Sequence, residues 1–232
     1  MSISAAAGSE IGNRYRENYD VAHLSVDPLL AIVADGMGDG RGSAMAGRTT
    51  VDTVVELLSA PATAKSVREA VAAAQRRVGE IGAELGELTG CTLTALVPGA
   101  DGFLIAQVGD SRVYRLRDGL LELLTTDHTM AWLGAVHGWY PFDSPQASSA
   151  RYQLTRYIGH PARPEPDVLT VFPRPGDVFL LCTDGIAEQV PYHRMLEILG
   201  QPRSPEELVW QLLADAEAAG GRDNATAIVV RV

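Results

Sequence analysis

The sequence predicts an α+β fold in which an antiparallel β-sandwich is flanked by helices on both sides, an α-β-β-α arrangement of four layers. Three observations support this prediction: short apolar runs separated by turn residues, long helical segments set apart from those runs, and a length of 232 residues. Strands joined by short turns form antiparallel sheet, and helices outside the strand-rich region pack against its faces. We expect residues 1–232 to form a single domain.

The strands are predicted from short runs rich in Val, Ile, Leu and Thr, each bounded by Gly, Pro or Asp. Residues 98–102 and 117–119 supply turn residues between neighbouring runs and predict hairpins. Residues 175–177 separate a later pair of runs, which favours antiparallel pairing there too. The predicted strands are residues 29–34, 92–97, 103–108, 112–116, 120–124, 168–172, 178–183 and 225–230.

The helices are predicted from apolar residues that recur with helical spacing. Ser66 with Glu69, and Ser204 with Glu207, match the capping box, in which the first residue and the third helical residue satisfy each other's exposed backbone N–H groups. Each pair therefore predicts the start of a helix. The predicted helices are residues 43–59, 66–88 and 205–219.

The charge of the chain limits its partners. It carries 19 basic and 29 acidic residues, a formal net charge of −10 at pH 7, so we expect no nucleic acid and no membrane as partner. Residues 1–9 lack the basic and apolar regions of a signal peptide, and no apolar run reaches membrane-spanning length. Cys91 and Cys182 lie in apolar segments, which predicts buried, reduced thiols. We expect a cytoplasmic monomer.

Aspartates recur where predicted strands end. Asp35, Asp110 and Asp184 each follow an apolar run directly and precede a glycine or a serine, and Asp223 comes just before the last predicted strand. A short carboxylate held by a rigid strand is a well-placed oxygen ligand, and a following glycine lets the backbone carbonyl approach a cation. If these side chains and Asp20 meet at one edge of the sandwich, their mutual repulsion calls for hard divalent cations.

Around these aspartates the chain resembles the metal-dependent protein phosphatases of the protein phosphatase 2C-like (PPM) family. The order and approximate spacing of the family's motifs are found along nearly the whole chain. The segments that carry the resemblance are Asp20 after Arg14-Tyr15-Arg16-Glu17-Asn18-Tyr19, Ala34-Asp35-Gly36-Met37-Gly38, Gly90-Cys91-Thr92-Leu93-Thr94, Gly109-Asp110-Ser111-Arg112, Leu154-Thr155-Arg156-Tyr157-Ile158-Gly159, Cys182-Thr183-Asp184-Gly185 and Asp223-Asn224-Ala225-Thr226.

The resemblance implies a pair of metal ions, Mn²⁺ or Mg²⁺. Asp35 would bridge both ions, Asp184 and Asp223 would complete the first, and the carbonyl of Gly36 would contribute to the second. Asp110 would serve a third, weaker site. Two such ions can activate a water and stabilise charge during in-line attack on phosphorus. The implied activity is hydrolysis of phosphoserine and phosphothreonine in proteins, with a kinase as indirect partner.

Two further roles follow from the resemblance. Asp20 would orient water at the metals, and an arginine would bind the phosphoryl oxygens through its planar guanidinium. In the family pattern this arginine falls between Arg14 and Arg16, so both stay candidates. Tyr19 stands where the family usually has Glu, which weakens the support of the second metal, and Met37 replaces the His of eukaryotic members.

Other functions remain open at the level of sequence. A pseudophosphatase that binds phosphoproteins or regulates them would fit Tyr19 and the shifted arginine, whereas the retained Asp35, Asp184 and Asp223 argue against it. A phosphatase dedicated to an anti-sigma-factor antagonist is another alternative. Residues 130–149 have no regular period and several aromatic residues. They predict either a surface loop with buried aromatic anchors or a flap that sets substrate specificity.

Overall fold

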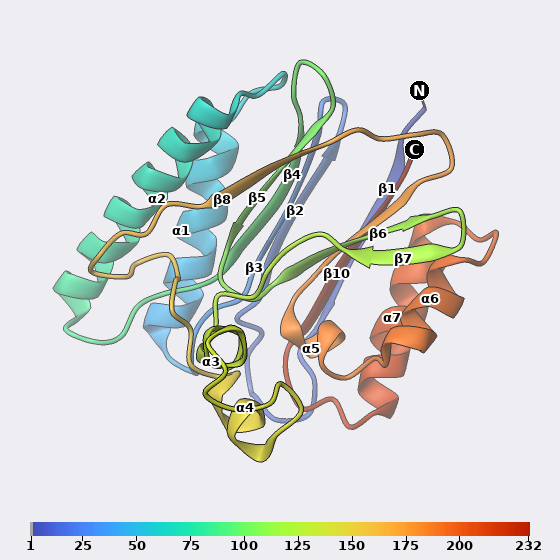
Figure 1. The fold of residues 1–232 in the computed structure, drawn as a ribbon. Coiled ribbons are helices and arrows are strands. Elements are labelled where there is room, and N and C mark those ends of the chain that lie inside the picture. The colour runs from blue at the N-terminus through green and yellow to red at the C-terminus, as the bar shows by residue number, and fades with distance from the viewer. Residues whose placement is uncertain (1) are drawn as a thin grey trace.

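Two five-stranded antiparallel sheets form the centre of the molecule in a computed structural model that describes residues 2–232. One sheet has the strand order β1-β10-β9-β6-β7 and the other the order β2-β3-β4-β5-β8. Helices α1 and α2 cover the outer face of the second sheet, and α6 and α7 lie on the side of the first (Figure 1). The predicted helix-flanked β-sandwich is therefore confirmed. The strands are β1 (Ser4–Glu10), β2 (Val21–Val26), β3 (Leu29–Ala34), β4 (Leu93–Pro98), β5 (Phe103–Val108), β6 (Arg112–Arg117), β7 (Leu120–Leu123), β8 (Asp167–Val171), β9 (Val178–Cys182) and β10 (Ala225–Arg231).

The central strands are apolar on both faces because each face is covered. In β3, Ile32 packs toward α1 and α2, whereas its neighbour Val33 packs between the two sheets. Period-two alternation thus divides one continuous apolar run between two cores. The inter-sheet core also contains Phe179 of β9 and Phe103 of β5, whose rings meet edge to face with their centroids 5.7 Å apart. These packed strands form a rigid frame for the loops at their ends.

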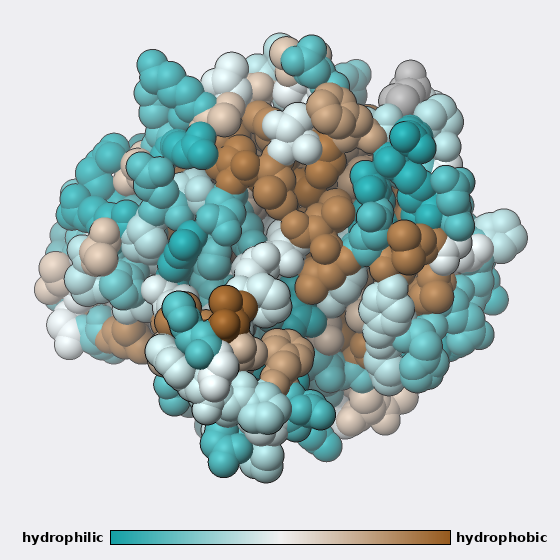
Figure 2. Space-filling view, viewed as in Figure 1, coloured by the Kyte–Doolittle hydropathy of each residue, from teal (hydrophilic) through white to brown (hydrophobic). Residues whose placement is uncertain are grey.

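Apolar side chains also reach the surface on one side of the sandwich. On the face shown in Figure 2 they gather over the β6–β7 hairpin and β8, and β7 and β8 are edge strands of the two sheets. The exposed members are Leu120, Leu123, Leu169 and Phe172. No helix covers this edge in the view of Figure 1.

The helices differ from the sequence prediction mainly at their ends. The N-cap of helix α2 lies three residues before the predicted one, because Thr63 takes this position and accepts a 3.0 Å hydrogen bond from the backbone of Ser66. The Ser66–Glu69 capping box is therefore wrong, whereas the Ser204–Glu207 box is confirmed. The helices are α1 (Arg41–Leu57), α2 (Ala64–Leu85), α3 (Met130–Val136), α4 (Pro145–Ala150), α5 (Asp184–Ala187), α6 (Tyr192–Leu199) and α7 (Pro205–Ala218).

Several elements were not predicted. Strands β1 and β2 lack long apolar runs, and the irregular stretch 130–149 contains α3 and the start of α4. Of its aromatic residues, Trp132, Trp139 and Phe142 are exposed. Only Tyr140 acts as an anchor, since it is half-buried and donates a hydrogen bond to the Met130 carbonyl. Residues 175–177 do not join a hairpin, because β8 and β9 belong to different sheets.

Two further expectations concerned the state of the cysteines and the absence of a membrane-spanning segment. Cys91 and Cys182 are free and buried, and burial raises the pKa of each thiol to about 12. Among residues 2–232, no helix is both long enough and apolar enough to cross a membrane.

Candidate metal centre

A cavity of about 550 Å³ opens at one end of the sandwich, where β3 and β9 end and β10 begins. Because β9 and β10 are antiparallel neighbours, the end of one strand meets the start of the other. The topology thus brings together carboxylates that lie far apart in the sequence. The cavity is lined by Arg14, Tyr15, Asp35, Gly36, Met37, Gly38, Leu88, Thr92, Asp110, Tyr152, Leu154, Asp184, Asp223 and Asn224.

Asp35 and Gly36 are fixed by backbone contacts at the end of β3. The Asp35 N–H donates to Thr92 Oγ1 at 2.9 Å, and the Asp35 carbonyl accepts from the Thr92 N–H at 2.8 Å. A Cβ at Gly36 would lie 2.8 Å from the Ser43 carbonyl oxygen and 2.9 Å from that of Tyr19. Only glycine fits at this position, as expected for a carbonyl that faces a ligand.

Asp184 and Asp223 are positioned by the contact between the start of α5 and the start of β10. The Asn224 side chain ties the start of β10 to the N-terminal segment as well: its Oδ1 accepts from the Tyr19 N–H at 2.8 Å, and its Nδ2 donates to the Ile11 carbonyl at 2.6 Å. Asp223 Oδ1 accepts from the Asn224 N–H at 2.8 Å. Three separate chain segments are therefore held against one another at the cavity.

Gly185→Ala is expected to break this arrangement. A Cβ at Gly185 would overlap the backbone carbonyl of Asn224, and neither backbone can move without shifting Asp184 or Asp223. We expect the free energy of unfolding to fall by more than about 2 kcal/mol, because the clash is between backbones in a packed region. Thermal unfolding measures the loss. Gly79→Ala is the matched control, since a Cβ at Gly79 in α2 meets nothing within 4 Å; equal stability of the two variants would contradict the account.

The carboxylates around the cavity share a strongly unfavourable environment. Burial, and then the neighbouring charges of Asp184 and Asp20, raise the pKa of Asp35 well above its ordinary value. Burial, and then Asp110 and Asp223, do the same to the pKa of Asp184. Burial is also the main cause that raises the pKa of Asp110 to about 7. Close carboxylates with such shifts are typical of a site built to hold positive charge.

The donor set fits hard divalent cations. Among residues 2–232, no Arg or Lys forms an ion pair with Asp35, Asp110, Asp184 or Asp223, and Asp184 Oδ1 is buried without any hydrogen-bond partner. Within the same part of the chain, however, no three Asp, Glu, His or Cys side chains converge closely enough to hold one ion alone. Carbonyl oxygens and water would therefore complete each coordination shell, as Mg²⁺ in particular prefers.

Asp20 lies behind the cavity and does not line it. Its side chain is buried, and its Oδ2 accepts hydrogen bonds from Thr183 Oγ1 at 2.8 Å and from Thr226 Oγ1 at 2.7 Å. Its Oδ1 has no hydrogen-bond partner within residues 2–232, and burial raises the pKa of Asp20 to about 6. Thr183 directly precedes Asp184, and Thr226 in β10 lies three residues after Asp223. Asp20 therefore ties the end of β9, which leads to Asp184, to the start of β10, which follows Asp223.

The two candidate arginines are in different places. Arg14 lines the cavity, and its guanidinium lies 5.0 Å from the centre of the Tyr15 ring. Burial raises the pKa of Asp223, and the positive charge of Arg14 offsets part of that rise. Arg16 is exposed and does not line the cavity. Of these two arginines, only Arg14 lies at the cavity, whereas the sequence left both as candidates for binding the phosphate.

Some residues at the cavity were not identified from the sequence. Tyr15, Leu88, Tyr152 and Leu154 line it, and none of them carries a charge that would mark it in the sequence. Tyr19, which stands at the position where Glu was expected, is buried and donates a hydrogen bond of 2.7 Å to the Asp39 carbonyl. Its hydroxyl therefore holds the loop that follows Gly36, and it offers the cavity no carboxylate.

Comparisons with known proteins agree with this geometry. The family model described as "Protein phosphatase 2C" matches residues 16–214. The chain is 31% identical over 211 residues to the serine/threonine phosphatase stp of Listeria welshimeri. This alignment covers 87% of the chain and 83% of the Listeria protein. It is 30% identical to the serine/threonine protein phosphatase PstP of Mycobacterium tuberculosis, over the whole chain and 45% of PstP.

Solved structures show the same likeness. The PPM Ser-Thr phosphatase MsPP of Mycobacterium smegmatis, in complex with cacodylate, superimposes with a TM-score of 0.87 at 32% identity, over 99% of this chain and 98% of MsPP. The catalytic domain of PstP in complex with two manganese ions superimposes with a TM-score of 0.87 at 28% identity, over 99% of this chain and 97% of that domain.

Proposed function

The chain belongs to the protein phosphatase 2C family, and from this premise we propose that it is a metal-dependent phosphatase that hydrolyses phosphoserine and phosphothreonine in proteins. The observation that carries the proposal is the cavity itself, where Asp35, Asp110, Asp184 and Asp223 meet and none of them forms an ion pair with a described Arg or Lys. The carboxylates and a phosphate are all negatively charged, so the site binds a phosphate only when cations neutralise the carboxylates and the phosphate.

The carboxylates divide the work of holding the cations. Asp35, Asp184, Asp223 and the Gly36 carbonyl would hold two ions, Mn²⁺ or Mg²⁺, and Asp110 would serve a third, weaker site. When bound, the ions supply Lewis acidity that activates water and offsets charge on the phosphoryl group. Asp20 keeps Thr183 and Thr226, and thereby the strand ends that carry Asp184 and Asp223, in place.

Arg14 binds the phosphoryl oxygens in this proposal, and Arg14→Ala is expected to raise the KM for a phosphothreonine peptide. The loss of kcat/KM should be about 10- to 100-fold, because a hydrogen bond to a charged group contributes about 1.5–3 kcal/mol. Steady-state kinetics on both variants measures it. Arg16→Ala is the matched control, since Arg16 is exposed outside the cavity. A larger loss in Arg16→Ala than in Arg14→Ala would overturn the assignment.

The rim of the cavity is where a protein substrate would meet the enzyme. Leu88 and Tyr152 line the cavity and are 63% and 71% exposed, so they are free to contact the chain on either side of a phosphoserine. The predicted flap lies beside them, because Thr129 at the start of α3 pairs with the cavity residue Leu154. Exposed rings of Trp132 and Phe142, with centroids 6.4 Å apart, support a role of this flap in substrate choice.

The pseudophosphatase alternative finds no support. It rested on Tyr19 and on the shifted arginine, yet Tyr19 leaves the carboxylates intact and Arg14 reaches the cavity. We further propose that residues 1–232 act as a single domain and a monomer in cytoplasmic signalling, opposite a protein kinase that phosphorylates the same substrates. The free buried thiols, Cys91 and Cys182, support a reducing compartment.

The experiment that tests the function is hydrolysis of p-nitrophenyl phosphate and of a phosphothreonine peptide by the purified chain. We expect turnover with added Mn²⁺, none after chelation with EDTA, and recovery when Mn²⁺ is restored. Turnover that persists in EDTA would show a mechanism without divalent cations. Absence of turnover at every Mn²⁺ and Mg²⁺ concentration would contradict the proposed function itself.

A further inference from the structure

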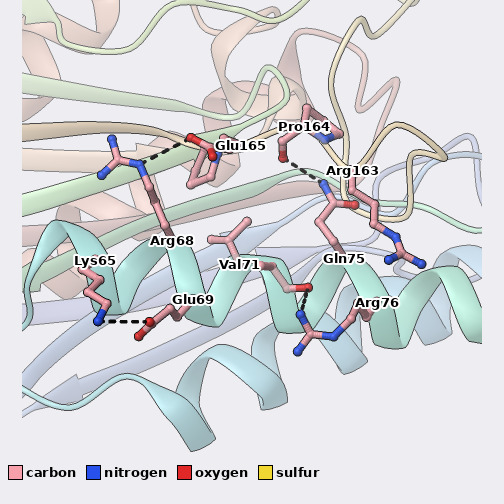
Figure 3. A pocket seen from close by; sticks show the side chains of 11 residues that line it. Lys65, Arg68, Glu69, Val71, Gln75, Arg76, Arg163, Pro164 and Glu165 are labelled. Atoms are coloured by element: carbon pink, nitrogen blue, oxygen red, sulfur yellow. Dashed lines mark hydrogen bonds and ion pairs between the residues drawn. The ribbon is translucent and has the colours of Figure 1, made fainter.

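A second hollow lies away from the catalytic cavity, between α2 and the segment of residues 163–166 (Figure 3). We call it the α2 groove. Its volume is about 470 Å³, and it shares no lining residue with the catalytic cavity. Val71, Ala72, Pro164 and Pro166 give it an apolar floor. A hollow of this size and composition accommodates apolar side chains of a ligand, and it is far larger than a single phosphate requires.

The α2 groove is held in shape by Gln75. The Gln75 side chain is buried, its Nε2 donates to the carbonyls of Tyr157 at 3.0 Å and Pro164 at 3.3 Å, and its Oε1 accepts from the Gly159 N–H at 2.8 Å. These bonds tie residues 157–164 to α2. The groove therefore exists before any ligand arrives, which reduces the ordering cost of binding. Because Gln75 is already satisfied, recognition rests on the apolar floor and on the charged rim.

The rim is basic although the chain is acidic overall. Four cations and two carboxylates line the groove, whereas the whole chain has a net charge of −10. Figure 3 shows Arg76 and Arg163 at one end of the groove, and neither forms an ion pair with any residue that the structure describes. At the other end, Lys65–Glu69 and Arg68–Glu165 are exposed pairs separated by 3.7 Å. Such loose pairs contribute little and exchange readily with another carboxylate.

The segment that forms one wall of the α2 groove also leads to the catalytic cavity. Leu154 lines the cavity and Arg163 lines the groove. Between them lies Tyr157, whose side chain packs against Gly90. The side chain of Met37, a cavity residue, lies against the same glycine, since a Cβ at Gly90 would meet both Tyr157 and Met37. A polypeptide whose phosphorylated residue occupies the cavity can therefore reach the groove along this segment. Leu154 and Arg163 are nine residues apart, so the cavity and the groove are separated by at most about 30 Å, which about ten residues of an extended substrate can span.

We propose that the α2 groove is a docking site for an acidic segment with interspersed apolar residues, which belongs to the phosphoprotein substrate and lies about ten residues from the phosphorylated one. The proposal rests on the phosphatase function above. Apolar side chains of the segment contact the floor of the groove, and its carboxylates face Arg76 and Arg163. Because the rest of the surface is acidic, the same charges orient an acidic segment toward this groove and away from other faces.

The first test is direct binding and does not depend on turnover. The probe is a fluorescein-labelled peptide, Glu-Leu-Asp-Leu-Glu-Leu-Asp, and the readout is fluorescence anisotropy at low ionic strength. We expect saturable binding to the full chain that weakens as salt is added. The double variant Arg76→Glu/Arg163→Glu should bind at least about tenfold more weakly, because two favourable charge contacts become repulsive. Arg48→Glu/Arg203→Glu is the charge-matched control on exposed arginines outside the groove and should bind as the parent does.

The second test asks whether the groove serves catalysis. A phosphothreonine peptide is joined to the same acidic segment through a Gly-Ser linker of about ten residues, and is compared with a peptide in which Lys replaces each Glu and Asp. We expect the acidic segment to lower KM in the parent and not in Arg76→Glu/Arg163→Glu, while both enzymes hydrolyse p-nitrophenyl phosphate equally.

The outcomes separate the two proposals. Absence of p-nitrophenyl phosphate hydrolysis in the parent contradicts the phosphatase function, and the anisotropy measurement still decides whether the groove binds acidic peptide. Equal binding by the parent and the groove variant, or an equal effect of the acidic and the Lys-containing segments on KM, would overturn the docking site.

Discussion

Asp184→Asn is expected to lower kcat/KM for a phosphothreonine peptide by more than about 100-fold at saturating Mn²⁺. Loss of a residue that only orients a metal ligand costs about 10- to 100-fold, so loss of a direct ligand should cost more. Asn keeps the size of the side chain and one oxygen, and it removes the charge that a cation requires. Asp184 Oδ1 is buried and has no hydrogen-bond partner in the described part of the chain, so the change breaks no hydrogen bond of that atom seen there.

The control for Asp184→Asn is Asp52→Asn on the exposed side of α1. It makes the same chemical change outside the cavity and should leave kcat/KM unchanged. Steady-state kinetics across a range of Mn²⁺ concentrations separates weaker metal binding from lower turnover at saturation. Activity of Asp184→Asn within a few-fold of the parent would remove Asp184 from the metal site.

The same substitution is expected to stabilise the metal-free protein. Burial and neighbouring carboxylates raise the pKa of Asp35 and of Asp184 well above their ordinary values. Between the ordinary and the raised pKa, the folded state binds more protons than the unfolded state, so stability is lost as pH rises through that range. Removing one carboxylate relieves part of this cost. We expect the free energy of unfolding of metal-free Asp184→Asn to exceed that of the parent by about 1–2 kcal/mol at pH 8.

Chemical denaturation in EDTA at pH 5 and at pH 8 measures this effect. The free energy of unfolding of the parent should be lower at pH 8 than at pH 5. The stabilisation of Asp184→Asn relative to the parent should be larger at pH 8. Added Mn²⁺ should reverse the order, because binding to the folded parent stabilises it by mass action and the variant binds less. A parent that is equally stable at both values of pH, with and without Mn²⁺, would contradict the electrostatic account.

The core of the site could be predicted from the sequence because rigid strands place it. Asp35 directly follows the apolar strand β3, Asp184 follows the apolar strand β9 after Thr183, and the antiparallel pairing of β9 with β10 brings Asp223 to the same cavity. Local sequence thus fixes where each carboxylate stands relative to its own strand. Their convergence depends on the sandwich, which the strand and turn pattern also predicted.

Features held by distant contacts could not be predicted. Strand β1 has the sequence Ser-Ala-Ala-Ala-Gly-Ser-Glu, which has little strand propensity, and it becomes a strand because it pairs with β10 at the opposite end of the chain. The start of α2 was placed too late because Thr63 and Ser66 compete as caps in the same short segment. The choice between Arg14 and Arg16 depends on the loop before Tyr19, which Asn224 holds from 205 residues away.

The most direct test of the central claim is anomalous diffraction from crystals of the chain soaked in Mn²⁺, recorded at the manganese absorption edge. We expect two strong peaks in the catalytic cavity, beside Asp35, Asp184, Asp223 and the Gly36 carbonyl. A cavity without manganese in a protein that hydrolyses phosphothreonine, or manganese bound only elsewhere, would contradict the account.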